Sequence, residues 1–108
     1  MEFADYQREA RKTAQYPTIG HAIVYPALGL AGEAGEVLEK IKKVFRDHNG
    51  DFTHHKESII KECGDVLWYL SALCDELGTN LDYVAHVNIE KLQSRKDRGV
   101  IGGKGDNR

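Results

Sequence analysis

The pattern of apolar and polar positions divides the chain into four helical segments separated by turn signals. The first segment has apolar residues at helical spacing, which predict a helix of about three turns: Phe3, Tyr6, Ala10 and Ala14. The break at Tyr16-Pro17 follows it. A longer periodic segment then runs from about His21 to the polar stretch at 47–51, and Pro26 is compatible with it only near its start or at a kink.

The second half of the chain predicts two further helices. Thr53 is positioned to cap a third helix, which Gly78 should stop because glycine readily adopts the left-handed conformation that ends helices. Thr79 followed by Asp82 resembles a capping box for a fourth helix that continues to about Lys96. No strand-like alternation competes with these patterns, so the predicted fold class is all-α.

Length and composition favour a single domain over 1–108. The chain has 108 residues, of which 41% are apolar, and this is enough for one hydrophobic core. The formal net charge of -2 gives no overall attraction to nucleic acid or to an anionic membrane. No apolar run is long enough to span a bilayer, and the N-terminal residues lack the apolar block of a secretory signal. We therefore expect a soluble, cytoplasmic protein without nucleic-acid or membrane partners.

The cysteines and the C-terminus add two smaller expectations. Cys63 and Cys74 lie about 16 Å apart along one predicted helix, which is too far for a disulfide within that helix, so we expect both to be reduced. Residues 99–108 form a glycine-rich, basic tail, and this composition predicts that the tail is mobile.

Two similar segments, EAGEVL at 33–38 and ECGDVL at 62–67, each contain two carboxylates three positions apart with a glycine between them. In both predicted helices the acidic pair borders the apolar stripe that should face the core. The four acids are Glu33, Glu36, Glu62 and Asp65. Gly35 and Gly64 indicate close helix packing or a functional constraint, because a glycine within a helix costs roughly 1 kcal/mol relative to alanine.

The short connection between these helices predicts an antiparallel hairpin that turns near residue 49. Folding the chain there puts Glu36 level with Glu62, and Glu33 level with Asp65. Like charges about 4 Å apart repel by roughly 4 kcal/mol per pair at an effective dielectric of 20, so a cation should balance them. All-oxygen ligands favour Mg²⁺, with Mn²⁺ as a possible substitute, over zinc.

Basic residues that could bind phosphate lie in three places. One face of the predicted fourth helix carries Asn88, Lys91 and Arg95. A basic helix C-terminus is also favoured by the helix dipole alone, and Lys40 and Lys43 on the second helix admit the same two interpretations. Lys104 and Arg108 lie among the tail glycines, where they could fold over bound phosphates or remain in a disordered segment.

Four segments of the chain resemble those of a known family: LGLAGEAGEVLEKIKKVFRD, KECGDVLWYL, NIEKLQSR and the terminal GGKGDNR. They are similar to the MazG-like nucleotide pyrophosphohydrolases of the all-α NTP pyrophosphatase superfamily. The family pattern, E-x-x-E followed by E-x-x-D, is matched in order by Glu33, Glu36, Glu62 and Asp65. The similarity begins at YQREARKTAQYP and reaches the last residue.

The resemblance implies a four-helix MazG-like bundle of the single-domain type, assembled as an oligomer, here a homodimer or homotetramer. It implies an enzyme that uses Mg²⁺ and metal-activated water to hydrolyse a nucleoside triphosphate, NTP or dNTP, to the monophosphate and pyrophosphate. By position, the four carboxylates become metal ligands and catalytic residues, one of which orients or deprotonates the attacking water. Lys91 and Arg95, supported by Asn88, become phosphate contacts.

Recognition of the base is less determined. Trp68 and Tyr69 could stack on a base, or they could pack in the core or against another subunit. Residues near the first break could also reach a base: Gln7, Tyr16 and His21. His54 and His55 are interpreted as the polar start of a helix and not as ligands.

Two other functional classes can be compared with this interpretation. A di-iron carboxylate bundle calls for E-x-x-H pairs, which the sequence lacks. The alternative is a non-catalytic helical interaction module, in which the acidic pairs are solvated surface, with Glu36 pairing to Lys40, and the tail binds a partner.

Overall fold

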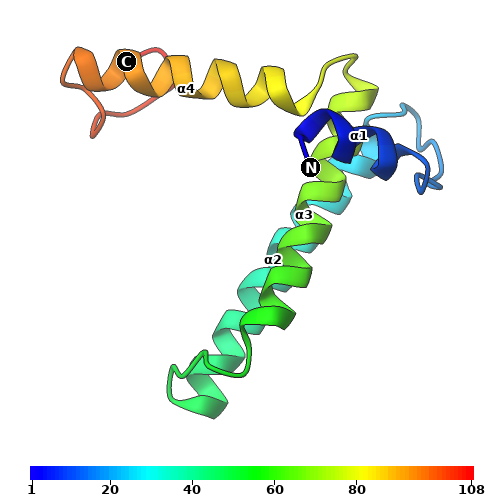
Figure 1. Cartoon of the computed structure of the whole chain (residues 1–108), viewed down its shortest axis with the longest axis vertical. Helices are drawn as coiled ribbons and strands as arrows, with labels where there is room; N and C mark the ends of the chain where they lie inside the picture. Colours follow the sequence, from blue (N-terminus) through cyan, green and yellow to red (C-terminus); the bar gives the residue numbers. More distant parts are fainter.

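The structure, a computed structural model, describes all 108 residues and confirms the all-α fold class with four helices and no strand. Figure 1 shows a long hairpin, a short helix beside one of its ends, and a fourth helix that projects away from it. The helices are α1 (Phe3–Arg11), α2 (Val24–His48), α3 (Lys56–Glu76) and α4 (Leu81–Asp97). None of them is long and apolar enough to cross a lipid bilayer.

The predicted hairpin is present, and α2 and α3 run antiparallel along each other (Figure 1). The chain reverses at Asn49 and Gly50, whose φ angles of 53° and 76° lie in the left-handed region. The Gly50 N–H donates to the Val44 carbonyl and closes the end of α2. Pro26 lies in the first turn of α2, where its missing N–H leaves no helical hydrogen bond unmade.

Two predicted helix caps are wrong by a few residues. The Thr53 hydroxyl donates to Asp51 within the turn, and α3 begins only at Lys56. The N-cap of α4 is Asn80, whose side-chain oxygen accepts from the Tyr83 N–H at 2.8 Å. Thr79 lies one residue before this cap and belongs to the end of α3, because its N–H donates to the Cys74 carbonyl.

Close packing at the base of the hairpin involves a glycine that the sequence did not single out. A Cβ on Gly29 would lie 2.1 Å from the ring of Tyr69, so only glycine fits there without a shift of the ring. Gly35 and Gly64, by contrast, face open space, with nothing within 4 Å of a Cβ added to either. Helix packing within one chain therefore does not explain why glycine occurs at these two positions of the similar segments 33–38 and 62–67.

A single buried glutamine joins α1, α3 and α4. The Gln7 amide donates to Asp75 at 2.6 Å and to the Thr79 carbonyl at 3.2 Å, and its oxygen accepts from the Leu81 N–H at 2.9 Å. All polar atoms of this side chain are thus used at the junction, and Gln7 is not available to recognise a base as the sequence suggested. Beyond this junction α4 extends into solvent (Figure 1).

The isolated chain is open in shape. Its radius of gyration is 16.8 Å, compared with about 13 Å expected for a compact domain of this length. Only 8 of 108 residues are buried, and many large apolar side chains are exposed. The four helices therefore do not close into a bundle within one chain, because α4 does not lie along the hairpin.

The C-terminal tail folds back on α4 instead of extending freely. The Arg95 guanidinium donates to the carbonyls of Gly105 and Asp106, at 3.2 and 2.9 Å. The Arg108 guanidinium in turn donates to the Val100 carbonyl at 3.0 Å. The glycine-rich composition predicted mobility, but it did not account for these two arginines, which bind the tail backbone.

Candidate functional site

Three carboxylates converge on one face of the hairpin. Glu33 of α2 and Glu62 and Asp65 of α3 each offer one oxygen, and these oxygens all lie within 4.8 Å of one another. The first two side chains are half-buried and the third is exposed. Burial raises the pKa of Glu33, and the neighbouring charges of Asp65, Glu62 and Glu36 raise it further. The cluster therefore concentrates negative charge where solvent screens it incompletely.

The fourth predicted carboxylate lies beside this group and not in it. Glu36 is exposed, and it is not among the three residues whose carboxylate oxygens lie within 4.8 Å of one another. Opposite Glu62 the structure has a cation instead, because the Lys40 ammonium lies 3.7 Å from its carboxylate. The expected i, i+4 pair between Glu36 and Lys40 is replaced by this contact across the hairpin.

Aromatic side chains adjoin the acids on the side away from the hairpin turn. A hollow of about 340 Å³ is lined by Thr13, Glu33, Asp65, Trp68 and Tyr69. The Trp68 indole N–H donates to the Thr13 hydroxyl at 2.8 Å, and the rings of Trp68 and Tyr69 meet edge to face with centroids 5.0 Å apart. The hollow therefore combines a wall of two aromatic rings with two carboxylates.

The connection between α1 and α2 completes this wall. The Tyr16 ring lies edge-on to Trp68, with centroids 6.2 Å apart, and stacks on Tyr25 at 5.9 Å. The Tyr16 hydroxyl donates to Glu76 at 2.6 Å, and this hydrogen bond lowers the pKa of the Glu76 carboxyl. Thr13 and Tyr25 were missed from the sequence because Thr13 and Tyr16, which bring them to this wall, lie in a connection whose fold over α3 no periodicity encodes.

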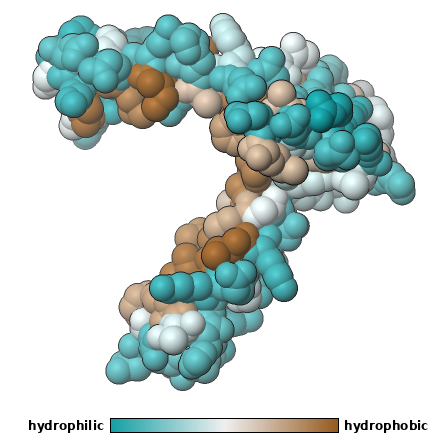
Figure 2. All heavy atoms as spheres, viewed as in Figure 1, coloured by the Kyte–Doolittle hydropathy of each residue, from teal (hydrophilic) through white to brown (hydrophobic).

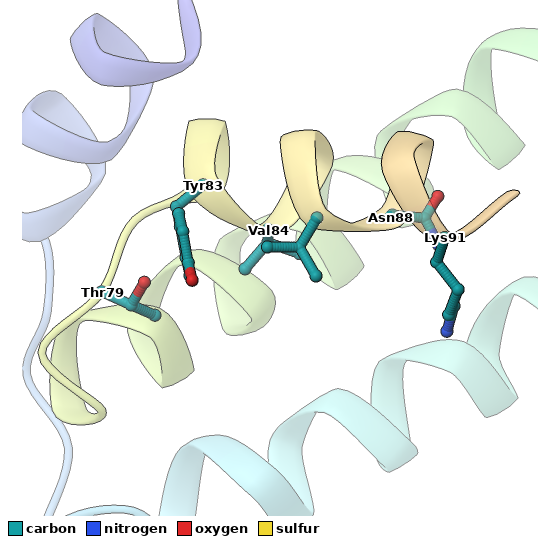
Figure 3. Close-up of a pocket in the computed structure, with 6 residues that line it drawn as sticks. Thr79, Tyr83, Val84, Asn88 and Lys91 are labelled. Atoms are coloured by element: carbon teal, nitrogen blue, oxygen red, sulfur yellow. The ribbon is translucent and has the colours of Figure 1, made fainter. Parts of the chain in front are cut away.

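The predicted phosphate contacts on α4 lie on a separate element. Asn88 and Lys91 line an open groove of about 430 Å³ along α4, with Thr79, Tyr83, Val84 and Val87. Figure 3 shows Tyr83 and Lys91 projecting from the same side of the helix. Since α4 leaves the hairpin at its base, one chain does not bring this groove to the three carboxylates (Figure 1).

Arg95 is covered by the tail. Its exposed fraction is 5%, and the Asp106 carboxylate lies 3.3 Å from its guanidinium and 3.2 Å from the Lys91 ammonium. Hydrogen bonds from these two cations lower the pKa of Asp106. In the tail, Lys104 is exposed, whereas Arg108 uses its guanidinium on backbone carbonyls. The tail therefore supplies an internal anion to the basic face of α4.

The carboxylate group fits a hard divalent cation. Its donors are all oxygens, they converge from two helices, and a positive ion would relieve the repulsion between them. No histidine or cysteine belongs to the group, which disfavours zinc.

Comparison with known proteins agrees with this arrangement. The sequence profile of the MazG nucleotide pyrophosphohydrolase domain matches residues 26–100, which include all of α3 and α4 and all of α2 except its first two residues. The Gene 37 protein of Mycobacterium phage L5 is 46% identical over 109 aligned positions, covering 95% of this chain and 96% of that protein. No solved structure matches significantly. The chain belongs to the family of MazG nucleotide pyrophosphohydrolase domains.

Proposed function

We propose that this protein is a Mg²⁺-dependent nucleoside triphosphate pyrophosphohydrolase that converts an NTP or dNTP to the monophosphate and pyrophosphate. The observation that carries the proposal is the convergence of Glu33, Glu62 and Asp65 within 4.8 Å, in a chain that belongs to the MazG family. Mn²⁺ is the expected substitute, because it accepts the same oxygen ligands.

The four acids of the repeated segment would hold the metal: Glu33, Glu36, Glu62 and Asp65. A bound divalent cation would polarise phosphoryl oxygens and supply a water of lowered pKa. The half-buried carboxylates of α2 and α3 orient the attacking water, and one of them accepts its proton. The water oxygen bonds to phosphorus, the anhydride bond between the α- and β-phosphates breaks, and pyrophosphate leaves with the bonding electron pair.

The aromatic hollow is the proposed place for the base. Trp68 and Tyr69 form its wall next to Asp65, and Tyr16 extends this wall. A base stacked there would place its phosphates beside the carboxylates without a change of helix positions. Stacking tolerates any base, so the wall favours nucleotides as a class and not one base.

Assembly as a homodimer or homotetramer is also proposed. Figure 2 shows apolar surface along the inner sides of both the hairpin and α4, which enclose an open angle. Exposed apolar side chains lie on both arms: Leu38, Phe45 and Ile60 on the hairpin, and Val84, Val87 and Leu92 on α4. A second copy would cover this surface and would let Asn88 and Lys91 approach substrate phosphates. Arg95, with Lys104 and Arg108 of the tail, would join them once the tail leaves Arg95 and turns toward the substrate.

One assay tests the activity directly. The purified protein is incubated with a panel of NTPs and dNTPs plus Mg²⁺, and the monophosphate and pyrophosphate are quantified. We expect metal-dependent formation of both products in equal amounts. Absence of any Mg²⁺-dependent cleavage across the panel would reject the enzyme and favour a non-catalytic interaction module. Light scattering after size-exclusion chromatography measures the assembly, and a monomer would reject the proposed oligomer.

A further inference from the structure

The hairpin carries a second polar cluster, at its turn. A small cavity of about 160 Å³ lies between the ends of α2 and α3. Its lining combines two apolar side chains, Val44 and Ile59, with five polar ones: Lys40, Lys43, His48, His55 and Ser58. No acidic residue lines the cavity, so its character is opposite to that of the carboxylate group on the same hairpin.

The two clusters share one face because their residues are in helical register. Lys40 and Lys43 follow Glu33 and Glu36 by seven positions, which is about two turns, or roughly 10.5 Å along α2. On α3 the same spacing holds in the opposite direction. There, His55 and Ser58 precede Glu62 and Asp65 by seven positions each. Both sets of residues therefore lie about two helical turns closer to the hairpin turn than the acids, on the same side of their helices, and they carry hydrogen-bond donors where the acids carry carboxylates.

The lining residues offer hydrogen-bond donors that suit an anion. The rings of His48 and His55 lie 4.2 Å apart, and each imidazole has an N–H even when neutral. Two ammonium groups and the Ser58 hydroxyl add further donors. Nearby acids are already engaged, since Asp47 accepts two 2.7 Å hydrogen bonds from the Arg46 guanidinium and Asp51 accepts from Thr53.

Lys40 connects this cavity to the carboxylates. Its side chain lines the cavity, and its ammonium lies 3.7 Å from Glu62, a member of the group of three. On the other side of that group, Trp68 follows Asp65 by one helical turn. One face of the hairpin thus presents, in order, an aromatic wall, an acidic centre and a basic cavity at the turn.

We propose that the cavity at the hairpin turn binds the pyrophosphate part of the substrate and receives it as the leaving group. This rests on the proposed function, and it fixes the direction of the substrate along the hairpin. The base lies at Trp68, the cleaved anhydride lies at the carboxylates, and the β- and γ-phosphates point toward Lys40 and Lys43. The rest of the cavity, with His48, receives the released pyrophosphate. These donors belong to the hairpin itself, so they act independently of α4 and of any second copy.

The test uses binding of inorganic pyrophosphate, which needs no turnover. Isothermal titration calorimetry in Mg²⁺ buffer compares the wild type with Lys43→Gln, His48→Gln and the double variant. Because a hydrogen bond to the charged pyrophosphate is lost, we expect each single variant to bind pyrophosphate roughly tenfold more weakly, and the double variant more weakly still. The matched control is Lys42→Gln, an exposed lysine of α2 paired with Glu39, which should leave the affinity unchanged.

Two further measurements separate the possible outcomes. A nucleoside monophosphate does not reach the cavity, so its affinity should stay the same in all four variants. Equal pyrophosphate affinity in the wild type and the double variant, or no pyrophosphate binding by the wild type, would overturn the proposal. If the wild type binds pyrophosphate through these residues but cleaves no triphosphate, the anion site stands and the proposed function fails.

Discussion

The hairpin and α4 carry similar numbers of candidate site residues, but packing within the chain fixes the positions of those on the hairpin and not of those on α4. On the hairpin, two long helices pack against each other, and the carboxylates of Glu33 and Glu62 are half-buried between them. On α4, only the first turn is anchored, and Lys91 lies in an open groove. Residues fixed by packing within the chain can form a site alone, whereas residues on an unpacked helix need another surface to position them.

The largest expected effect is on the hairpin. Glu62→Gln removes a charged member of the carboxylate group, so we expect turnover of nucleoside triphosphate to fall by about 100-fold or more with little change in thermal stability. Steady-state kinetics with varied Mg²⁺ measures it. Glu36→Gln should also lower turnover by orders of magnitude, because Glu36 is the fourth proposed ligand of the metal.

The matched control for these variants is Glu39→Gln. This side chain pairs only with Lys42 on the surface of α2, at 2.8 Å, and its loss should leave turnover unchanged. Full activity of both Glu36→Gln and Glu62→Gln would mean that the hairpin does not hold the catalytic centre.

Next in size is a packing variant at the base of the hairpin. Gly29→Ala places a methyl group 2.1 Å from the Tyr69 ring, and overpacking of this kind destabilises by about 1–3 kcal/mol. Urea unfolding followed by circular dichroism measures the change. Gly32→Ala is the control on the same helix, where nothing lies within 4 Å, and it should stabilise by up to roughly 1 kcal/mol. Equal effects of the two substitutions would show that Tyr69 is not held against α2.

The junction between the two regions is tested by Gln7→Ala. This change leaves the buried Leu81 N–H without its acceptor, for which we expect a loss of about 1–3 kcal/mol. Hydrogen exchange should quicken at the start of α4 and remain unchanged in the middle of the hairpin. The exposed Gln15→Ala serves as the control. Uniform quickening along the whole chain would contradict the view that α4 is anchored separately.

The smallest expected effect concerns the tail. Asp106→Asn removes the carboxylate that pairs with Lys91 and Arg95. Amide hydrogen exchange in residues 99–108 should therefore quicken, while amide exchange in the hairpin stays the same. Because the pKa of Asp106 is lowered, the contact is present at neutral pH and is lost as the pH falls through that lowered value. An unchanged exchange rate would show that backbone bonds to Arg95 suffice to hold the tail.

The sequence predicted the hairpin well because its determinants are local. Helical periodicity, the turn at Asn49 and Gly50, and the antiparallel packing together place Glu33, Glu62 and Asp65 side by side. Glu36 lies outside this group although it has the same spacing from Glu33 as Asp65 has from Glu62, so matching sequence positions across the turn does not predict its place.

What the sequence did not predict depends on single long-range contacts. The direction of α4 follows from one buried amide, Gln7, which is separated from Leu81 by 74 positions. The tail follows α4 because Arg95 binds its carbonyls, and a composition rich in glycine gives no sign of this. The N-cap of α4 was assigned one residue early because Thr79 is used by the preceding helix.

The left-handed turn at Asn49 and Gly50 also has a consequence for folding. It joins the two helices that carry the carboxylates, and Glu33 and Glu62 are only 29 positions apart along the chain. Contacts between residues close in sequence form early, because little loop-closure entropy opposes them. The hairpin is therefore expected to assemble its acidic centre as an early folding unit, before Gln7 anchors α4 and before a second copy is met.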